Sequence, residues 1–320
     1  MRNLTTTKLP KIRLPYNLDG YENLINIVEK ENLKTVCQEA NCPNIFDCFS
    51  KGTLTFMILG SICTRNCLYC NVKTGKPLPP DKNEPKKIAD IIKKLKLDYA
   101  VITCVTRDDL NDGGAGVFAE AVKEIKKINP VRSPSDGASD GSPNKKSGLT
   151  SNGVNPKCNV ELLISDLNAN GAALKTIIDA NAEVIGHNVE VVKRLFPILR
   201  PQGNYERTIE LLGNIKKYDS EIITKSGFMV GLGENEKEII QTMKDIKDAN
   251  CDIITIGQYL APSKNHASVE KFYSMEEFAF FKQIGESLGF ECIESGPLVR
   301  SSFNARDSYE KARRKTCKVS

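Results

Sequence analysis

Residues 55–70, TFMILGSICTRNCLYC, run from a short apolar segment directly into three cysteines. The segment 55–59 is dominated by large apolar residues, which predicts a buried strand. Cys63, Cys67 and Cys70 follow it at a C-x3-C-x2-C spacing. Three thiolates on one short loop can hold three irons of a 4Fe–4S cluster and leave the fourth iron open to another ligand. Zinc is the alternative, but zinc sites usually have four protein ligands, and the chain contains only two histidines.

Around this loop, short β-branched runs alternate with amphipathic stretches, which is typical of parallel βαβ units. Six strands are expected, at residues 55–59, 99–104, 159–164, 184–187, 224–230 and 253–258. Helices are expected where apolar residues recur three and four positions apart, at 117–127, 172–181, 205–217 and 237–249. Right-handed crossovers would place the helices outside and the strands inside. The predicted fold class is α/β, a partial (β/α)6 TIM-like barrel.

Residues 131–157, VRSPSDGASDGSPNKKSGLTSNGVNPK, interrupt this alternation. They are rich in Ser, Gly, Pro and Asn and have almost no large apolar side chain, so they cannot bury enough surface to offset the entropy of ordering. The strand and helix pattern resumes in the same style after them. We therefore predict a disordered surface insertion within one barrel, not a linker between domains.

Composition limits the class of protein further. Of the 320 residues 40% are apolar, enough for a sizeable core, and the net charge of +5 is too mild to indicate nucleic-acid binding. No stretch approaches about 18 consecutive apolar residues, and the first residues lack the apolar region of a secretory signal. We expect a cytoplasmic protein with no membrane association. The basic start, MRNLTTTKLPKIRLP, leaves an organelle-targeting segment as the less favoured alternative.

The chain has eleven cysteines, and six of them lie between Cys37 and Cys70. Disulfide frameworks belong mainly to small secreted proteins, so metal or cluster ligation explains this concentration better. The other five are expected to be small buried apolar residues: Cys104, Cys158, Cys251, Cys292 and Cys317. His187 and His266 are expected to be hydrogen-bonded structural residues rather than ligands.

The three-cysteine loop, with the aromatic Tyr69 before its last cysteine and a strand before it, resembles the signature of the radical S-adenosylmethionine superfamily. The resemblance implies that the open iron binds the amino and carboxylate groups of S-adenosylmethionine. Electron transfer from the reduced cluster would then release a 5′-deoxyadenosyl radical, which can take hydrogen from an unactivated C–H bond. The cofactor would supply this chemistry, and the protein would supply positioning and exclusion of water.

A second triplet, Cys37, Cys42 and Cys48, has a C-x4-C-x5-C spacing, and the string EANCPNIFDCF around it closely resembles the N-terminal auxiliary-cluster motif of lipoyl synthases. In that family the auxiliary 4Fe–4S cluster is dismantled to provide two sulfur atoms, which are inserted at C6 and C8 of a protein-bound octanoyl chain. The resemblance extends from residue 11 to residue 305, apart from the insertion.

A serine in a C-terminal Arg-Ser-Ser-Tyr motif completes the auxiliary cluster in lipoyl synthases. This chain has GPLVRSSFNA at 296–305, with Phe303 where the family usually has Tyr. The resemblance implies Ser302 as the ligand, with Ser301 as the alternative. An alkoxide is a weaker partner for iron than a thiolate, so such a ligand could detach when the cluster is consumed. A serine pair that caps a C-terminal helix is the structural alternative.

Three further strings resemble lipoyl synthases: VITCVTRDDLNDGGAG (with Arg107, Asp108 and Asp109), KSGFMVGLGE (with Gly227, Gly231 and Glu234) and DIITIGQYL. Glycines after a strand usually mark only a tight turn, but active sites gather at the carboxyl ends of barrel strands, so a place near the cofactor is expected. The candidate cofactor-binding residues are Tyr69, Asn188, which would bind the ribose, and Arg200, which would meet a carboxylate. No catalytic residue beyond the cluster ligands is expected.

The resemblance implies a sulfurtransferase of the lipoyl synthase type with two 4Fe–4S clusters and S-adenosylmethionine as cofactors. Three regions are expected: an extension at 1–50 with the auxiliary cysteines, the barrel at 51–290, and a segment at 291–320 that closes the auxiliary cluster. The implied partners are an octanoylated lipoyl carrier domain, from a 2-oxoacid dehydrogenase E2 or a glycine cleavage H protein, and a reductant such as flavodoxin or ferredoxin. The alternatives are another radical sulfur-inserting enzyme, such as a methylthiotransferase, and a non-catalytic structural zinc protein.

Overall fold

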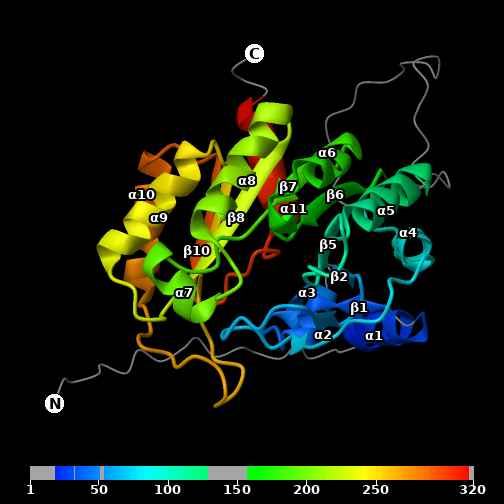
Figure 1. Ribbon diagram of the computed structural model, residues 1–320, viewed down its shortest axis with the longest axis horizontal. Coiled ribbons are helices and arrows are strands. Elements are labelled where there is room, and N and C mark those ends of the chain that lie inside the picture. The colour runs from blue at the N-terminus through cyan, green and yellow to red at the C-terminus, as the bar shows by residue number, and fades with distance from the viewer. Residues whose placement is uncertain (1–18, 32, 51–53, 129–156, 317–320) are drawn as a thin grey trace.

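The computed structural model of the chain describes residues 19–31, 33–50, 54–128 and 157–316 (Figure 1). Apart from Lys157, the predicted insertion at 131–157 lies outside the described residues, and so does Cys317. Figure 1 shows the N-terminal helices α1, α2 and α3 gathered at one end of the molecule, beside β1 and β2.

One eight-stranded sheet organises the fold, in the order β1-β2-β5-β6-β7-β8-β9-β10. The strands are β1 (Lys34–Thr35), β2 (Thr55–Ile58), β5 (Tyr99–Cys104), β6 (Asn159–Leu163), β7 (Val184–Gly186), β8 (Ile223–Val230), β9 (Ile253–Gln258) and β10 (Cys292–Gly296). Every pairing from β2 to β10 is parallel, and β1 alone is antiparallel to its neighbour. A small second sheet pairs β3 (Ile62–Cys63) with β4 (Lys73–Thr74).

The helices are α1 (Asp19–Lys30), α2 (Val36–Glu39), α3 (Ile45–Ser50), α4 (Glu84–Leu95), α5 (Ala115–Ile128), α6 (Gly171–Asp179), α7 (Phe196–Leu199), α8 (Tyr205–Tyr218), α9 (Glu236–Asp248), α10 (Met275–Ser287) and α11 (Ala305–Thr316), with short 3-10 turns η1 (Leu167–Ala169) and η2 (Lys193–Leu195). Helices α4 to α10 lie along the chain between the parallel strands β2 and β10, whereas α1, α2 and α3 precede β2 and α11 follows β10. Polar caps start several of them, because the first N–H groups of a helix lack partners within it. Asn235 and Ser274 both form capping boxes, with Glu238 and Glu277.

The predicted strands and helices are all present, in the predicted order, and their ends differ from the prediction by at most two residues. A parallel barrel of helix-connected strands is therefore confirmed. The sheet goes beyond the six expected strands with a seventh parallel strand, β10, whose sequence CIESG is half polar and gives little strand signal. None of the helices in the described ranges is both long and apolar enough to cross a membrane.

Helix α11 fills the end of the barrel where the strands begin. Its buried residues Ala305, Tyr309 and Ala312 pack against the first residues of β5, β7, β8, β9 and β10. The ring centroids of Tyr309 and Tyr99 are 5.7 Å apart. The segment between β10 and α11 therefore has to cross the interior, and it carries Arg300, Ser301 and Ser302.

Candidate functional site

A cavity of about 320 Å³ lies inside the barrel at the carboxyl ends of the strands. Its lining includes polar and sulfur-containing side chains from well-separated parts of the chain: Cys37, Cys42, Asn44, Cys48, Cys70, Cys104, Asn188, Glu190, Arg300, Ser301 and Ser302. The triplet Cys37, Cys42 and Cys48 and the serine pair predicted from the sequence thus line one cavity. Of the 63–70 loop, Cys70 reaches the cavity wall.

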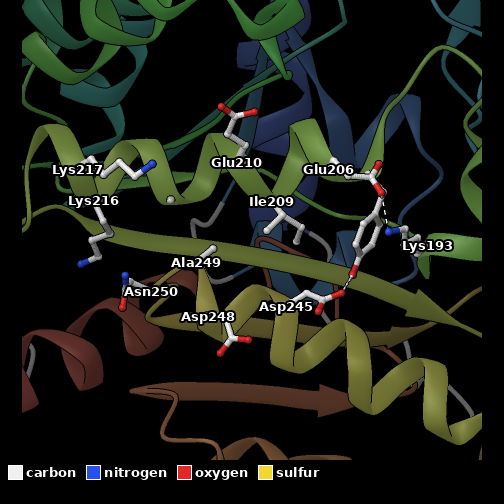
Figure 2. Close-up of a pocket in the computed structure, with 12 residues that line it drawn as sticks. Lys193, Glu206, Ile209, Glu210, Lys216, Lys217, Asp245, Asp248, Ala249 and Asn250 are labelled. Atoms are coloured by element: carbon white, nitrogen blue, oxygen red, sulfur yellow. Dashed lines mark hydrogen bonds and ion pairs between the residues drawn. The ribbon is translucent and has the colours of Figure 1, made fainter.

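A second hollow on the described surface lies elsewhere. It measures about 670 Å³ and runs between α8 and α9 on the outside of the barrel (Figure 2). Figure 2 shows charged side chains along it, and they pair with one another: Lys193 Nζ lies 2.6 Å from a Glu206 oxygen, and the Tyr205 hydroxyl donates to Asp245 at 2.7 Å. No predicted site residue lines it, so the smaller interior cavity is the candidate site.

Neighbouring segments hold the 63–70 loop on both sides. Leu59, with a left-handed φ of 70°, turns the chain away from β2, and its N–H donates to the buried Glu84 carboxylate at 2.8 Å. Cys63 pairs with β4 across the small sheet. On the other side the Leu68 N–H donates to the Leu199 carbonyl at 2.9 Å. His266 contacts the Cys70 carbonyl through Nε2 at 3.2 Å, which fits the structural role expected of it.

The auxiliary triplet follows β1: Cys37 lies on α2, Cys48 on α3, and Cys42 in the turn between these two short helices. Thr35 caps α2 by accepting from the Gln38 N–H, which sets Cys37 in the first turn. The N–H groups of Cys42 and Cys48 donate to the Cys37 and Asn44 carbonyls at 3.0 and 2.9 Å. Asn44 also donates through Nδ2 to the Leu298 carbonyl at 2.7 Å, which ties this N-terminal segment to the C-terminal serine segment.

Thiols in each triplet have raised pKa values. Burial raises the pKa of the Cys37 thiol to about 12, with smaller contributions in the same direction from Cys42 and Cys48 included in that value. Burial also raises the pKa of Cys70 to about 12, with Cys67 and Cys63 adding to the effect. Such thiols stay protonated at neutral pH unless a cation stabilises the thiolates, and cluster binding would release their protons.

Among the described residues, no three His, Cys, Asp or Glu side chains are arranged to share a single metal ion. Cys37, Cys42, Cys63, Cys67 and Cys70 are all free thiols.

Comparison with known proteins agrees with this geometry. The family model of the Radical SAM superfamily matches residues 57–246. The lipoyl synthase of Caldicellulosiruptor saccharolyticus is 45% identical over 305 residues, which cover 94% of this chain and 98% of that protein. The lipoyl synthase of Rubrobacter xylanophilus is 44% identical over 304 residues, covering 95% of this chain and 86% of that one.

The chain belongs to the lipoyl synthase family. Among solved structures, Streptococcus suis SuiB bound to its precursor peptide SuiA superposes with a TM-score of 0.53 at 10% identity, over 92% of this chain and 58% of SuiB, and shows a shared fold only. As a lipoyl synthase of the radical S-adenosylmethionine superfamily, the chain uses S-adenosylmethionine and iron–sulfur chemistry.

One wall of the cavity suits the cofactor of a lipoyl synthase. Asn188 Oδ1 is buried and has no hydrogen-bond partner among the described residues. A buried acceptor without a partner is costly, so a ligand hydroxyl at this position would satisfy it. Arg200 donates to the Asn188 carbonyl at 3.1 Å and so supports the wall without lining the cavity. Tyr69 lies beside Cys67, and burial raises the pKa of its hydroxyl.

Glu190 is a cavity residue that sequence reasoning missed. It sits just after β7 with a left-handed φ of 71°, which is rare for a residue with a side chain. Burial raises the pKa of its carboxyl, and Arg200 and Asn188 oppose this effect. The sequence offered one hint of its role: Glu190 is an acidic residue four positions after the end of a strand, at the end of the string IGHNVE.

The other predicted residues are divided between the cavity and its supports. Gly227 lines the cavity, whereas Gly231 lies in a turn in which its N–H donates to Glu234 at 2.6 Å. Arg107 donates to Asp109 and to the Leu59 carbonyl beneath the turn that leads to the loop.

The structural expectations for the remaining residues mostly hold. His187 is buried and hydrogen-bonded through both ring nitrogens, to the Ile164 carbonyl and to Thr208. Cys158, Cys251 and Cys292 are buried, as expected. Cys104 differs because it is only half-buried and lines the cavity.

Proposed function

We propose that this chain is a cytoplasmic sulfurtransferase that inserts two sulfur atoms, at C6 and C8, into an octanoyl chain carried on a lysine of a lipoyl carrier domain. The observation that carries this proposal is the single cavity lined by Cys37, Cys42 and Cys48, by the serine pair, and by Cys70 of the 63–70 loop. Neither alternative, a methylthiotransferase or a structural zinc protein, would explain why Ser301 and Ser302 line the same cavity as Cys37, Cys42 and Cys48.

Cys63, Cys67 and Cys70 would hold one 4Fe–4S cluster, whose open iron takes S-adenosylmethionine. When both are bound, the cluster and S-adenosylmethionine would supply the radical that removes hydrogen from the octanoyl chain. The protein's part is positioning. Asn188 Oδ1 would accept a ribose hydroxyl, Glu190 would accept a second one, and Arg200 would hold both residues in place from behind.

Cys37, Cys42 and Cys48 would hold the auxiliary cluster, which serves as the sulfur source and is therefore a substrate. Ser302 would be its fourth ligand, and Ser301 is the alternative. The Asn44 side chain would keep the serine segment against the cysteines through the Leu298 carbonyl, at 2.7 Å. Because a serine oxygen binds iron more weakly than a thiolate, this ligand is the one expected to leave first.

The remaining wall of the cavity suits an acyl chain. Its apolar lining includes Leu54, Met57, Leu163, Phe228, Met229 and Val299. Apolar walls bind a hydrocarbon tail and exclude water from a reactive centre.

A tethered substrate also needs a surface on this protein that binds the carrier. The carrier would be an E2 or H protein, and a flavodoxin or ferredoxin would deliver electrons. The regions 1–50, 51–290 and 291–320 would act as cluster extension, barrel and closing segment.

The experiment is anaerobic reconstitution, iron and sulfide analysis, and mass spectrometry of an octanoylated carrier peptide. The wild-type chain should bind about eight irons and add two sulfurs to the peptide. Cys37→Ala should still cleave S-adenosylmethionine but add no sulfur, and Cys63→Ala should do neither. Cys104→Ala is the matched control, because its thiol lines the cavity but belongs to neither triplet. Sulfur addition by Cys37→Ala at the wild-type yield would overturn the proposal.

The serine assignment has its own test. Ser302→Ala should lower single-turnover sulfur insertion and weaken retention of the auxiliary cluster, while Ser301→Ala should leave both close to the wild-type values. The reverse result would move the ligand role to Ser301. If a chain with both Ser301→Ala and Ser302→Ala still inserts sulfur at the wild-type yield, neither serine is the ligand.

A further inference from the structure

The side chain at the centre of the three-cysteine loop points away from the cavity and into the protein. Arg65 lies between Cys63 and Cys67, yet it is only 3% exposed. Its Nε and Nη2 donate to the two oxygens of Asp108, both at 2.8 Å. Its Nη1 and Nη2 donate to the two oxygens of Asp166 at 2.9 and 2.7 Å. One guanidinium thus forms bidentate pairs with two carboxylates.

Each carboxylate follows a different strand of the barrel. Asp108 lies after β5, and Asp166 lies after β6, so the loop is tied to two neighbouring strand ends. Asp166 is completely buried, and Arg207 on α8 donates at 2.6 Å to Oδ2, the same oxygen that accepts from Arg65 Nη1. Burial alone would raise the pKa of Asp166, but the Arg65 guanidinium holds it well below its usual range.

The backbone beside Asp166 adopts an uncommon conformation that completes the contact. Leu167, Asn168 and Ala169 have consecutive φ values of 49°, 50° and 61°, all in the left-handed region. Such residues are strained, and they persist only where the surrounding structure holds them. The turn places Asn168 Oδ1 2.9 Å from Arg65 Nη2.

The main chain of the loop is held at the same place. The Thr64 hydroxyl donates to the Thr106 carbonyl at 3.0 Å, and the Thr74 hydroxyl donates to the Arg65 carbonyl at 3.0 Å. The Arg65 N–H points at the Cys63 sulfur, 3.4 Å away. The loop is therefore fixed through its side chain and its backbone together.

A buried set of ion pairs contributes little to stability compared with well-packed apolar residues, because desolvating the charges offsets their attraction. What it does supply is geometry, since planar bidentate pairs permit few orientations. A lysine could not replace Arg65 in this arrangement, because a point charge cannot bind two carboxylates along two edges.

We propose that Arg65 is a positioning residue that sets the arrangement of Cys63, Cys67 and Cys70 before any iron is bound, through its contacts with Asp108 and Asp166. The inference rests on the proposed role of these cysteines as cluster ligands. It goes beyond that role in making the loop a preformed site rather than one that the cluster orders. It also makes cluster retention depend on two carboxylates that touch neither the cluster nor the substrate.

The test compares two adjacent carboxylates. Asp108→Asn keeps the shape of the side chain but removes the charge that Arg65 binds. Asp109→Asn is the matched control, because Asp109 binds the buried Arg107 with the same bidentate geometry at 2.8 Å and does not contact the loop. Asp108 is already 30% exposed, so the Asn variant is expected to fold, and Arg65→Lys supplies a second and harsher variant.

Two readouts are needed, one without iron. In the iron-free chain, hydrogen exchange of the peptide spanning 63–70 should be about tenfold faster in Asp108→Asn and unchanged in Asp109→Asn, since a hydrogen bond to a charged group contributes about this factor or more. In the reconstituted chain, a chelator should remove iron from this loop about tenfold faster in Asp108→Asn.

The outcomes separate the two proposals. Wild-type exchange and chelation rates in both Asp108→Asn and Arg65→Lys would overturn the positioning role. Equal acceleration in Asp109→Asn would also overturn it, since the effect would then be one of general stability. If Cys63→Ala binds as much iron as the wild type, the proposed cluster role fails instead, and the iron-free exchange measurement still decides whether Arg65 orders the loop.

Discussion

Replacing Gly257 with alanine should disturb the auxiliary half of the site and leave the 63–70 loop intact. Gly257 lies in β9, and an added Cβ would sit 2.2 Å from the Val299 carbonyl oxygen and 3.2 Å from its carbon. These are backbone atoms, so no side-chain rotation can relieve the contact. The strand pairing fixes the position of Gly257 as well, because Gly257 is paired with Gly296 at the end of β10, three residues before Val299.

The size of the effect follows from the overlap. Contacts under 3.0 Å essentially never occur for a real Cβ, so the Val299 carbonyl must move by about 0.8 Å. Overpacking of this kind costs about 1–3 kcal/mol in the free energy of unfolding. For a chain of this size, the melting temperature should fall by about 1.5 °C for each kcal/mol. Arg300, Ser301 and Ser302 follow directly and should be displaced with it.

The assay combines thermal unfolding with iron analysis after reconstitution. Gly257→Ala should lose about four irons and its sulfur insertion, yet still cleave S-adenosylmethionine through the other cluster. Gly213→Ala is the control, because its nearest neighbour would be Ala249 Cβ at 4.0 Å, on the outer face of α8. Alanine there should stabilise the helix by about 0.5–1 kcal/mol. A Gly257→Ala chain with wild-type stability and full iron content would refute the reasoning.

Three further results are expected. Burial and the nearby Arg200 lower the pKa of His187 to about 4, so between about pH 6.5 and pH 4 only the unfolded chain takes up this proton. As the pH is lowered through this range, the free energy of unfolding should decrease by about 1.4 kcal/mol per pH unit. His187→Gln should flatten that slope in denaturation measured at pH 5 and 7. Glu190→Gln should raise the dissociation constant for S-adenosylmethionine about tenfold in equilibrium dialysis without changing iron content, because a hydrogen bond to a charged group is lost. Asn235→Ala removes a capping box from α9 and should cost about 1 kcal/mol in thermal unfolding, with sulfur insertion preserved.

The sequence was sufficient for features whose signal is local. Strands such as 99–104 and helices such as 205–217 show periodic apolar patterns within a few turns, and both are present within two residues of the predicted ends. The loop with Cys63, Cys67 and Cys70 directly follows β2, as its position after an apolar run predicted.

Features that depend on long-range partners were not predictable. Arg65 gave no sign that it would bind Asp108 and Asp166, because these residues lie far apart along the chain and meet only where parallel strands end side by side. Glu190 was missed because its place in the cavity depends on residues far away along the chain, such as Cys42 and Ser302. Strand β10 was missed because Glu294 and Ser295 interrupt its apolar pattern.

The contact between Asn44 and the Leu298 carbonyl has a consequence for synthesis of the protein. Both cysteine triplets leave the ribosome before β10, the serine segment and α11. The cavity wall that contains Val299, Arg300, Ser301 and Ser302 can therefore form only after residue 302 has been made. A chain truncated before residue 298 would lack both this wall and the partner of the Asn44 side chain.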